Sequence, residues 1–414
     1  MRKLCLTLIG IYIMFLGAFA QKTSRPDTVY ETKPLRIDEV NLVSSYYTQE
    51  GIHSAVTGGI GNEHVTDLSN GLEIKFVGWD MRHNKHTLGV EAGFDHHTSA
   101  SSAWVSKTGA SRTGGTRIYP AVNWTMENDR GNSFGIGTYY SAEYNYKSFG
   151  LELHGGKKIS SNTEINGKAS GFFDKVKMIY PSELIPAVTY TSPTTYTTAS
   201  GRTVRSGGGK SEDDGIPSSA RNTFTASLSV SQIINTRMQF SVMLDLVGQT
   251  GYLGLPFHRV YFTDGTVHVE NLPDTRTKLP IGIRFNYFAG DNVVIRSYYR
   301  YYTDSWGLTA HTAELEVPVK IGSFFSIAPF YRYYTQSAAK YFGAYGTHTA
   351  SDTYYTSNYS LSKLTSQFVG AGLHLAPPKG ILTQHFNALD VRFGHYTQST
   401  ELYANSISFA FTFK

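Results

Sequence analysis

The residues best suited to recognise a solute lie in a segment of tyrosine and arginine that occurs twice. Tyr299–Ser305 reads YRYYTDS, and Tyr331–Ser337 repeats it as YRYYTQS after 32 positions. Shorter versions of the pattern occur at Tyr46–Gln49 and at His395–Gln398. Arginine holds carboxylates and phosphates through two parallel N–H donors, and a tyrosine hydroxyl donates or accepts one more hydrogen bond. These side chains indicate a surface for anionic or polar groups, provided that they share one face.

A β-strand would place them on one face, because its successive side chains alternate between two sides. Val293, Ile295, Tyr299 and Tyr301 share one parity, which leaves the charged residues of this segment on the other side. We expect that polar side, with its neighbours, to line an interior. The expected lining residues are Arg284, Arg296, Tyr298, Arg300, Tyr302, Asp304, Glu314, Glu316, Arg332, Tyr334, Gln336, Asp390, Arg392, Tyr396 and Gln398.

Segments of period two run through almost the whole chain, and helical periodicity is nearly absent. The last residues show this most clearly, since Ile407, Phe409, Phe411 and Phe413 alternate with small or polar residues. A bacterial outer-membrane barrel turns such an apolar face to lipid and its polar face inward, and the last strand closes the cylinder. Lys414 departs from the usual form, in which the aromatic residue itself ends the chain.

Turn residues divide the alternating segments into about 16 strands, an even number as in bacterial barrels. The predicted fold is all-β: a transmembrane, antiparallel, up-and-down β-barrel. Tyr299, Tyr301, Tyr331 and Tyr333 would lie on its outer face, at the membrane interface. The expected strands are 40–49, 72–79, 86–98, 116–125, 133–144, 148–158, 163–175, 223–233, 237–249, 281–288, 293–304, 308–319, 325–336, 367–375, 386–397 and 402–413.

The connections between these strands alternate in length. Short turns are expected at 160–162, 235–236, 289–292 and 320–324, whereas the other set contains the long loops 99–115, 177–222, 250–280 and 337–366. Short turns of such barrels face the periplasm and long loops face outward. We therefore expect the long loops to be extracellular.

The amino terminus has the form of an export leader. A basic start at Met1–Lys3 precedes the apolar run Leu4–Phe19, and Ala18–Ala20 fits the small-x-small cleavage pattern. The alternative, a membrane anchor, is disfavoured because the run is short for a spanning helix. We expect a signal peptide at 1–20, cleaved after Ala20, a periplasmic segment at 21–39 and the barrel at 40–414 in the outer membrane.

Composition argues against several other classes of protein. The 414 residues carry a net charge of +5 without a lysine- or arginine-rich run, so nucleic acid is not an expected partner. Cys5 is the only cysteine and lies in the leader, which removes disulfides and thiolate sites from the mature chain. After the leader, no apolar run reaches the length of a spanning helix.

No constellation of residues marks catalysis or cofactor binding. Asp80, His83 and His86 would suit a metal, but short polar turns often contain histidine. Gly209–Ser211 resembles the end of a phosphate-binding loop, yet the required upstream glycine is Val204. No spacing pairs a nucleophile with a base. We therefore expect no enzyme and no resident cofactor or metal.

Several motifs resemble an uncharacterised family of Gram-negative outer-membrane proteins, frequent in Bacteroidota and known as a domain of unknown function. The resemblance covers nearly the whole mature chain. It implies the barrel and its location, and it transfers no mechanism. It also implies redox-linked envelope neighbours, hence a periplasmic or lipoprotein partner. The motifs are Ser44–Tyr47, His53–Gly61, Pro273–Arg276, Tyr299–Tyr302, Trp306–Gly307 and Ala310–Glu314.

The charged interior has two interpretations. The charges can pair across strands and brace the wall, or they can form a constriction that selects solutes. Our leading hypothesis is a pore, or a partner-gated export channel, for a small polar or peptidic solute. A closed barrel that binds a surface ligand or protein through its loops is the second hypothesis, and an outer-membrane enzyme the third. Outer-membrane lipid and the barrel assembly machinery are the expected partners.

Overall fold

The computed structural model describes residues 32–98, 114–184, 195–197, 203–205 and 216–414. The expected signal peptide, and the expected periplasmic segment up to residue 31, lie outside these ranges. None of the helices in the described part is long and apolar enough to cross a membrane.

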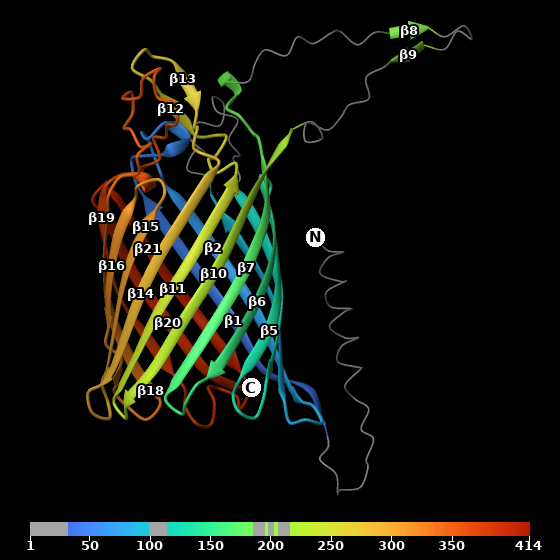
Figure 1. The fold of residues 1–414 in the computed structure, drawn as a ribbon, viewed down its shortest axis with the longest axis vertical. Coiled ribbons are helices and arrows are strands. Elements are labelled where there is room, and N and C mark those ends of the chain that lie inside the picture. The colour runs from blue at the N-terminus through green and yellow to red at the C-terminus, as the bar shows by residue number, and fades with distance from the viewer. Residues whose placement is uncertain (1–31, 99–113, 185–194, 198–202, 206–215) are drawn as a thin grey trace, which may run out of the picture.

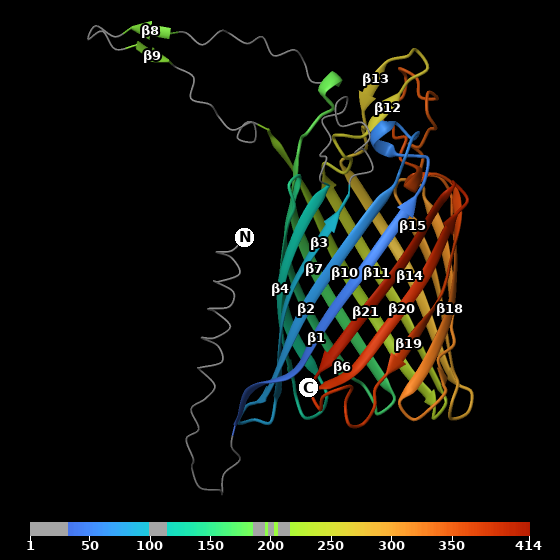
Figure 2. The ribbon, with the colours of Figure 1, turned by 180° about the vertical axis from the view of Figure 1, so that it is seen from behind.

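Seventeen of the described strands form one closed antiparallel barrel, in which each crossing of the wall pairs with the next one along the chain (Figures 1 and 2). Two of them, β16 and β17, are one crossing interrupted at Val317 and Pro318, so the 17 strands make 16 crossings. This confirms the predicted fold class. The strands are β1 (Lys33–Glu50), β2 (Val65–Trp79), β3 (Lys85–His97), β4 (Gly115–Glu127), β5 (Ser133–Ala142), β6 (Tyr146–Lys158), β7 (Thr163–Lys177), β10 (Ser218–Asn235), β11 (Met238–Gly251), β14 (Thr275–Phe288), β15 (Val294–Asp304), β16 (Thr309–Glu316), β17 (Val319–Lys320), β18 (Phe325–Gln336), β19 (Leu364–Leu375), β20 (Phe386–Gln398) and β21 (Leu402–Phe413).

The first and last strands close the cylinder. Val40 pairs with Phe413, and the register continues without a shift to Glu50 and Tyr403. The strand β1 begins earlier, at Lys33, inside the segment that we expected to precede the barrel. Those first residues pair only with β2, through two register shifts, because β21 has already ended. Val40 is thus the first residue of β1 with partners on both sides.

The outer surface of the barrel is apolar. On the neighbouring strands β10 and β11, Phe224, Leu228 and Leu246 are each about half exposed on one face. Ser227 and Ser229, of opposite parity, turn to the other side. Exposed aliphatic and aromatic side chains in this density are costly in water and suit a lipid environment.

The connections segregate by length between the two ends of the barrel. Short turns and the carboxyl terminus lie at one end, which we call the short-turn end, and long loops lie at the other, the long-loop end (Figure 1). The loops contain the hairpins β8 (Thr195–Thr197) with β9 (Thr203–Arg205) and β12 (Arg259–Tyr261) with β13 (Val267–Val269). They also contain the 3-10 turns η1 (Ala55–Thr57), η3 (Ser182–Leu184) and η5 (Tyr359–Leu361).

Glycines let large rings lie flat against the interior wall. A Cβ built on Gly394 would meet the Phe368 ring at 2.3 Å, and one on Gly93 would meet the Tyr119 ring at 2.2 Å. Both contacts are much shorter than real Cβ atoms allow, so only glycine leaves room for these rings. The wall is therefore smooth where an aromatic side chain would otherwise project into the lumen.

Candidate functional site

The long loops build an ordered structure over one side of the barrel mouth. We call this structure the loop cap and define it as residues 51–64, 252–274 and 337–363. Ala339 of the cap packs in an apolar core with the buried Trp306 and Leu308 of the turn between β15 and β16, and Tyr302 and Tyr334 of the barrel wall pack against this core. Because those two tyrosines belong to the interior face, the cap lies directly above that part of the lumen.

A buried arginine ties the loops to one another. Arg259 is only 2% exposed, and it donates to Glu183 Oε1 at 2.5 Å and to the Val56 carbonyl at 2.7 Å. Arg259 and its two partners come from three different loops, at 252–274, 178–184 and 51–64. The sequence analysis did not single out this residue, since no periodicity identifies a loop arginine as buried.

A buried carboxylate forms the second polar centre of the cap. Glu270 accepts hydrogen bonds from Thr356 Oγ1 at 2.5 Å and from the Leu255 amide at 2.8 Å, and His258 Nδ1 lies 3.5 Å away. Burial by itself would raise the pKa of Glu270. The His258 charge and these hydrogen bonds outweigh it and hold the pKa below its usual value.

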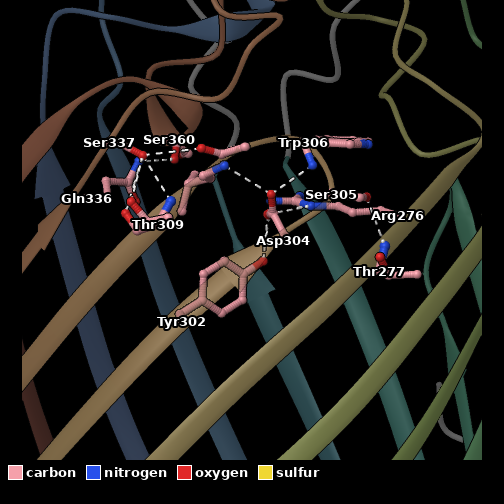
Figure 3. Close-up of polar contacts among 12 residues, drawn as sticks. Arg276, Thr277, Tyr302, Asp304, Ser305, Trp306, Thr309, Gln336, Ser337 and Ser360 are labelled. Atoms are coloured by element: carbon pink, nitrogen blue, oxygen red, sulfur yellow. Dashed lines mark hydrogen bonds and ion pairs between the residues drawn. The ribbon is translucent and has the colours of Figure 1, made fainter.

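Below the cap, four tyrosines repeat one hydrogen bond around the wall, and we call them the tyrosine collar. Each hydroxyl donates to the residue two positions ahead, on the same face of its own strand. Figure 3 shows the member on β15, where Tyr302 and Arg276 converge on Asp304. The pairs are Tyr47–Gln49 (2.8 Å), Tyr302–Asp304 (2.8 Å), Tyr334–Gln336 (2.6 Å) and Tyr396–Gln398 (2.6 Å).

The strand register brings the predicted lining residues into one surface. Tyr298, Glu314, Arg332, Phe368 and Tyr396 are successive cross-strand partners over β15, β16, β18, β19 and β20. We call the five arginines of this surface the arginine wall. They are Arg284, Arg296, Arg300, Arg332 and Arg392.

Three of these arginines are paired with carboxylates. Arg332 Nε lies 2.7 Å from Glu314, while Arg296 and Arg392 lie 2.9 and 3.0 Å from the two oxygens of Glu316. The Arg392 side chain reaches from β20 to β16 across the Phe330 ring, whose centroid is 4.0 Å from its guanidinium carbon. These three contacts fit the bracing interpretation of the charges.

The other two arginines differ. Among the described residues, no carboxylate lies within 4.0 Å of Arg284 or Arg300. Arg284 stacks near the Tyr298 ring at 5.7 Å, and the buried Arg300 Nε has no hydrogen-bond partner. Two guanidinium groups on this wall are thus available to a ligand.

A pair of adjoining cavities opens at this surface. The first, of about 370 Å³, is lined by Arg300, Arg332 and the tyrosines Tyr298, Tyr334 and Tyr396. The second, of about 390 Å³, shares Arg332, Tyr396 and Ser366 with it and extends to Tyr47 and Gln398. Both volumes suit a small solute. Their polar lining combines arginine and hydroxyl groups with one carboxylate, Glu314, which is paired with Arg332.

Two predicted lining residues, Asp390 and Asp304, do not contribute to this surface. Asp390 faces the interior toward the short-turn end, where it accepts from His374 at 2.7 Å. Asp304 is saturated by Arg276, Tyr302 and the amides of Trp306 and Leu308. Sequence reasoning assigned no role to Arg276, because it lies in a segment expected to be a loop.

The histidine-containing turn at residues 80–84 has a structural role for its carboxylate. Asp80 accepts from the amides of Arg82 and Asn84 at 2.8 and 2.9 Å, and His86 Nε2 lies 3.3 Å away. Within the described ranges, no group of three His, Cys, Asp or Glu side chains could hold a metal ion.

A family model described as "Protein of unknown function (DUF3570)" matches residues 90–407. The chain belongs to this family. The assignment confirms the resemblance drawn from the sequence motifs. No curated protein matches the chain.

Solved structures with a similar fold include outer-membrane proteins of low identity. A "Bacterial polysaccharide outer membrane secretin" is 10% identical with a TM-score of 0.45, covering 91% of this chain and 98% of that one. Pseudomonas aeruginosa OccD3 (OpdP) is 8% identical with a TM-score of 0.41, covering 93% and 92%. Acinetobacter baumannii OccAB3 is 8% identical with a TM-score of 0.39, covering 91% and 99%.

Proposed function

We propose that this protein is an outer-membrane channel for a small polar or peptidic solute, and that the arginine wall selects anionic groups on that solute. The observation that carries the proposal is the state of Arg284 and Arg300. Both face the lumen without a carboxylate partner among the described residues, and Arg300 lines the cavity of about 370 Å³. A purely structural network would be expected to pair such charges, because an unpaired partly buried cation is unfavourable.

The outer-membrane location rests on three features of the chain. The leader directs export, the outer face of the barrel is apolar, and β21 ends in the alternating Phe409, Phe411 and Phe413. In this orientation the short-turn end faces the periplasm and the loop cap faces outward. The barrel assembly machinery would insert the chain, and a periplasmic or lipoprotein partner would approach from the short-turn end.

The ordered loop cap favours a second candidate function. Its buried Arg259 and Glu270 and its apolar core make it a built structure, which a purely passive loop set would not need. In this alternative the cap binds a surface ligand or a partner that opens the channel. Under either candidate we propose no enzymatic role and no cofactor.

The test is single-channel conductance of the refolded mature protein in a planar bilayer. We expect stable conductance steps with a preference for chloride over potassium. Replacing both Arg300 and Arg332 with alanine should lower the chloride-to-potassium permeability ratio roughly twofold or more, because two fixed positive charges leave the lumen.

The matched control removes the same charge outside the lumen, by Arg82→Ala with Arg237→Ala in two turns of the short-turn end. This double variant should keep the wild-type ratio. Heat-modifiable gel mobility would establish that each variant is folded. Unchanged selectivity in a folded Arg300→Ala, Arg332→Ala channel would make these arginines structural, and silence from folded wild-type protein would favour the second candidate.

A further inference from the structure

A further polar cavity, separate from the pair at the arginine wall, lies in a different part of the interior wall. It has a volume of about 780 Å³ and is formed by β3, β4, β5, β6, β7 and β10. Three carboxylates line it, from Glu91, Glu152 and Asp174. Its volume falls in the range typical of small-molecule sites.

Asp174 is the unusual member of this lining. It is only 5% exposed, and its Oδ2 accepts from the Tyr146 hydroxyl, whereas its Oδ1 has no partner. Arg221 stands directly opposite in the register but donates instead to the Tyr252 and Gly254 carbonyls, both at 2.8 Å. A buried carboxylate with one unsatisfied oxygen is costly. A donor brought by a ligand would remove that cost.

The remaining charges leave the cavity negative. Glu91 has a neutral partner, the Asn123 amide at 3.0 Å, and Glu152 pairs with Lys168 and lies 3.3 Å from His154. Arg117, which also lines the cavity, donates to the Tyr139 hydroxyl at 3.1 Å, and its charge is opposed by Asp95 at 3.9 Å, outside the lining. Asp174 and Glu91 therefore lack a cationic partner among the described residues.

Aromatic rings complete the site. Tyr139, Tyr146 and Phe172 line the same cavity, and Tyr139 packs edge-on against Phe172 at 6.0 Å. Carboxylates beside aromatic faces bind organic ammonium groups, by ion pairing and by cation–π attraction. The described residues offer no three-ligand metal group here, so the chemistry favours an ammonium ion over a divalent metal.

We propose that this cavity binds the primary ammonium group of the transported solute. Together with the arginine wall, which takes the carboxylate, it makes the solute class zwitterionic: amino acids or short peptides with free termini. This assignment rests on the proposed channel function for its link to transport. The ammonium site itself is defined by Asp174 together with Tyr146, Tyr139 and Phe172, whereas Glu91 adds negative charge at the far side of the same cavity, four strands away.

The test uses three probes that differ only in their end groups: trialanine, N-acetyl-trialanine and trialanine amide. Binding to the refolded full mature chain is measured by titration calorimetry, and passage by swelling of liposomes that contain the same preparation. We expect acetylation to weaken binding about tenfold or more, because a charge-assisted contact is lost. The Asp174→Asn variant should bind trialanine as weakly as wild type binds the acetylated probe.

Phe172→Leu is the second variant: it removes the aromatic face beside Asp174, should reduce the preference for the free amine, and decides the matter if Asp174→Asn fails to fold. Asp245→Asn, which removes a carboxylate of β11 outside this cavity, is the matched control and should keep the wild-type preference for the free amine. Equal binding of trialanine and its acetylated form would overturn the proposal, as would a folded Asp174→Asn variant that still discriminates. If discrimination depends on Asp174 but no probe passes the membrane, the site stands and the channel function fails.

Discussion

At the scale of single residues, the interior wall divides into paired and unpaired charges. Arg296, Arg332 and Arg392 have carboxylate partners at 2.7–3.0 Å, so their removal would leave Glu314 and Glu316 exposed to each other's charge. Arg300 has no such partner among the described residues, and its removal leaves no carboxylate unpaired. Substitution by alanine should therefore lower the free energy of unfolding at Arg296, Arg332 and Arg392. At Arg300 it should weaken ligand binding instead.

The flat rings of the wall give a prediction about stability. Gly394→Ala should destabilise the barrel by about 1–3 kcal/mol. The new Cβ would lie 2.3 Å from the Phe368 ring, so the ring would have to move. Gly372→Ala is the matched control, since its Cβ would make an ordinary contact with Ala328 at 3.8 Å. The free energy of unfolding of both variants can be measured in urea, with heat-modifiable gel mobility reporting the folded fraction. Equal stability of the two variants would show that the wall adapts to the added methyl group.

Parity placed many of the interior residues from the sequence alone, because strand alternation needs only a correct register. Arg300, Arg332, Tyr334 and Tyr396 meet around one cavity as their parity indicated. The paired state of Glu316, which serves two arginines from different strands, could not be predicted. It depends on which side chains extend over neighbouring strands of the wall, and no local sequence pattern contains that information.

At the scale of elements, the strands were predictable and their ends less so. The sequence placed the start of β14 at residue 281, but the strand begins at Thr275. Pro280 lies within it, and the ladder to β11 is interrupted between Leu244–Ile281 and Val247–Lys278. A proline normally argues against a paired strand. Here β15 still pairs with Pro280 through Tyr302, on the other side.

The loop cap was not predictable, because its contacts join loops that are distant in sequence. Glu270 and Thr356 are 86 residues apart, and Arg259 and Val56 are 203 apart. Neither pair belongs to a periodic segment. Loop composition indicated only polar connections, whereas the buried partners create a folded element.

That element should respond to acid. The pKa of Glu270 is lower in the folded cap than its unfolded value of about 4.3, so the ionised form stabilises the cap. This stabilisation is complete above the unfolded pKa and is lost as the pH falls through the lower folded pKa. Hydrogen–deuterium exchange of residues 252–274 should be constant from pH 7 to about 5, after correction for intrinsic rates, and should rise below about pH 4.

Glu270→Gln should weaken the cap at neutral pH by about 1–3 kcal/mol and remove most of this acid response, because the amide keeps the shape but not the charge. Glu401→Gln, on the exposed turn between β20 and β21, is the control and should keep the wild-type profile. An acid response that survives in the Glu270 variant would assign it to other groups of the cap.

At the scale of the whole molecule, the lumen has two chemically different sides. The arginine wall occupies β14 to β20, and the carboxylate cavity occupies β3 to β10. Closure by β1 and β21 holds both on one continuous surface. In the proposed channel, a solute with charges of both signs would meet both sites in one passage, and conduction would require that it bind weakly at each.

In the proposed channel, the loop cap would control access from the long-loop end, because it lies above this surface. Gln336 and Leu364 are cross-strand partners at the ends of β18 and β19, so a Gly-Gly turn in place of residues 338–362 keeps the strand pairing, while Gln336 loses its hydrogen bonds to the Ser360 and Ser362 carbonyls. The deletion removes Ala339, Tyr341 and Leu361 from the apolar cluster that contains Tyr302 and Tyr334. We expect single-channel conductance to rise roughly twofold or more, because the covered part of the mouth becomes accessible. Retained heat-modifiable mobility would establish that the shortened barrel is folded. If that folded barrel had the same conductance as wild type, solutes would pass beside the cap, and the cap would act only as a binding surface.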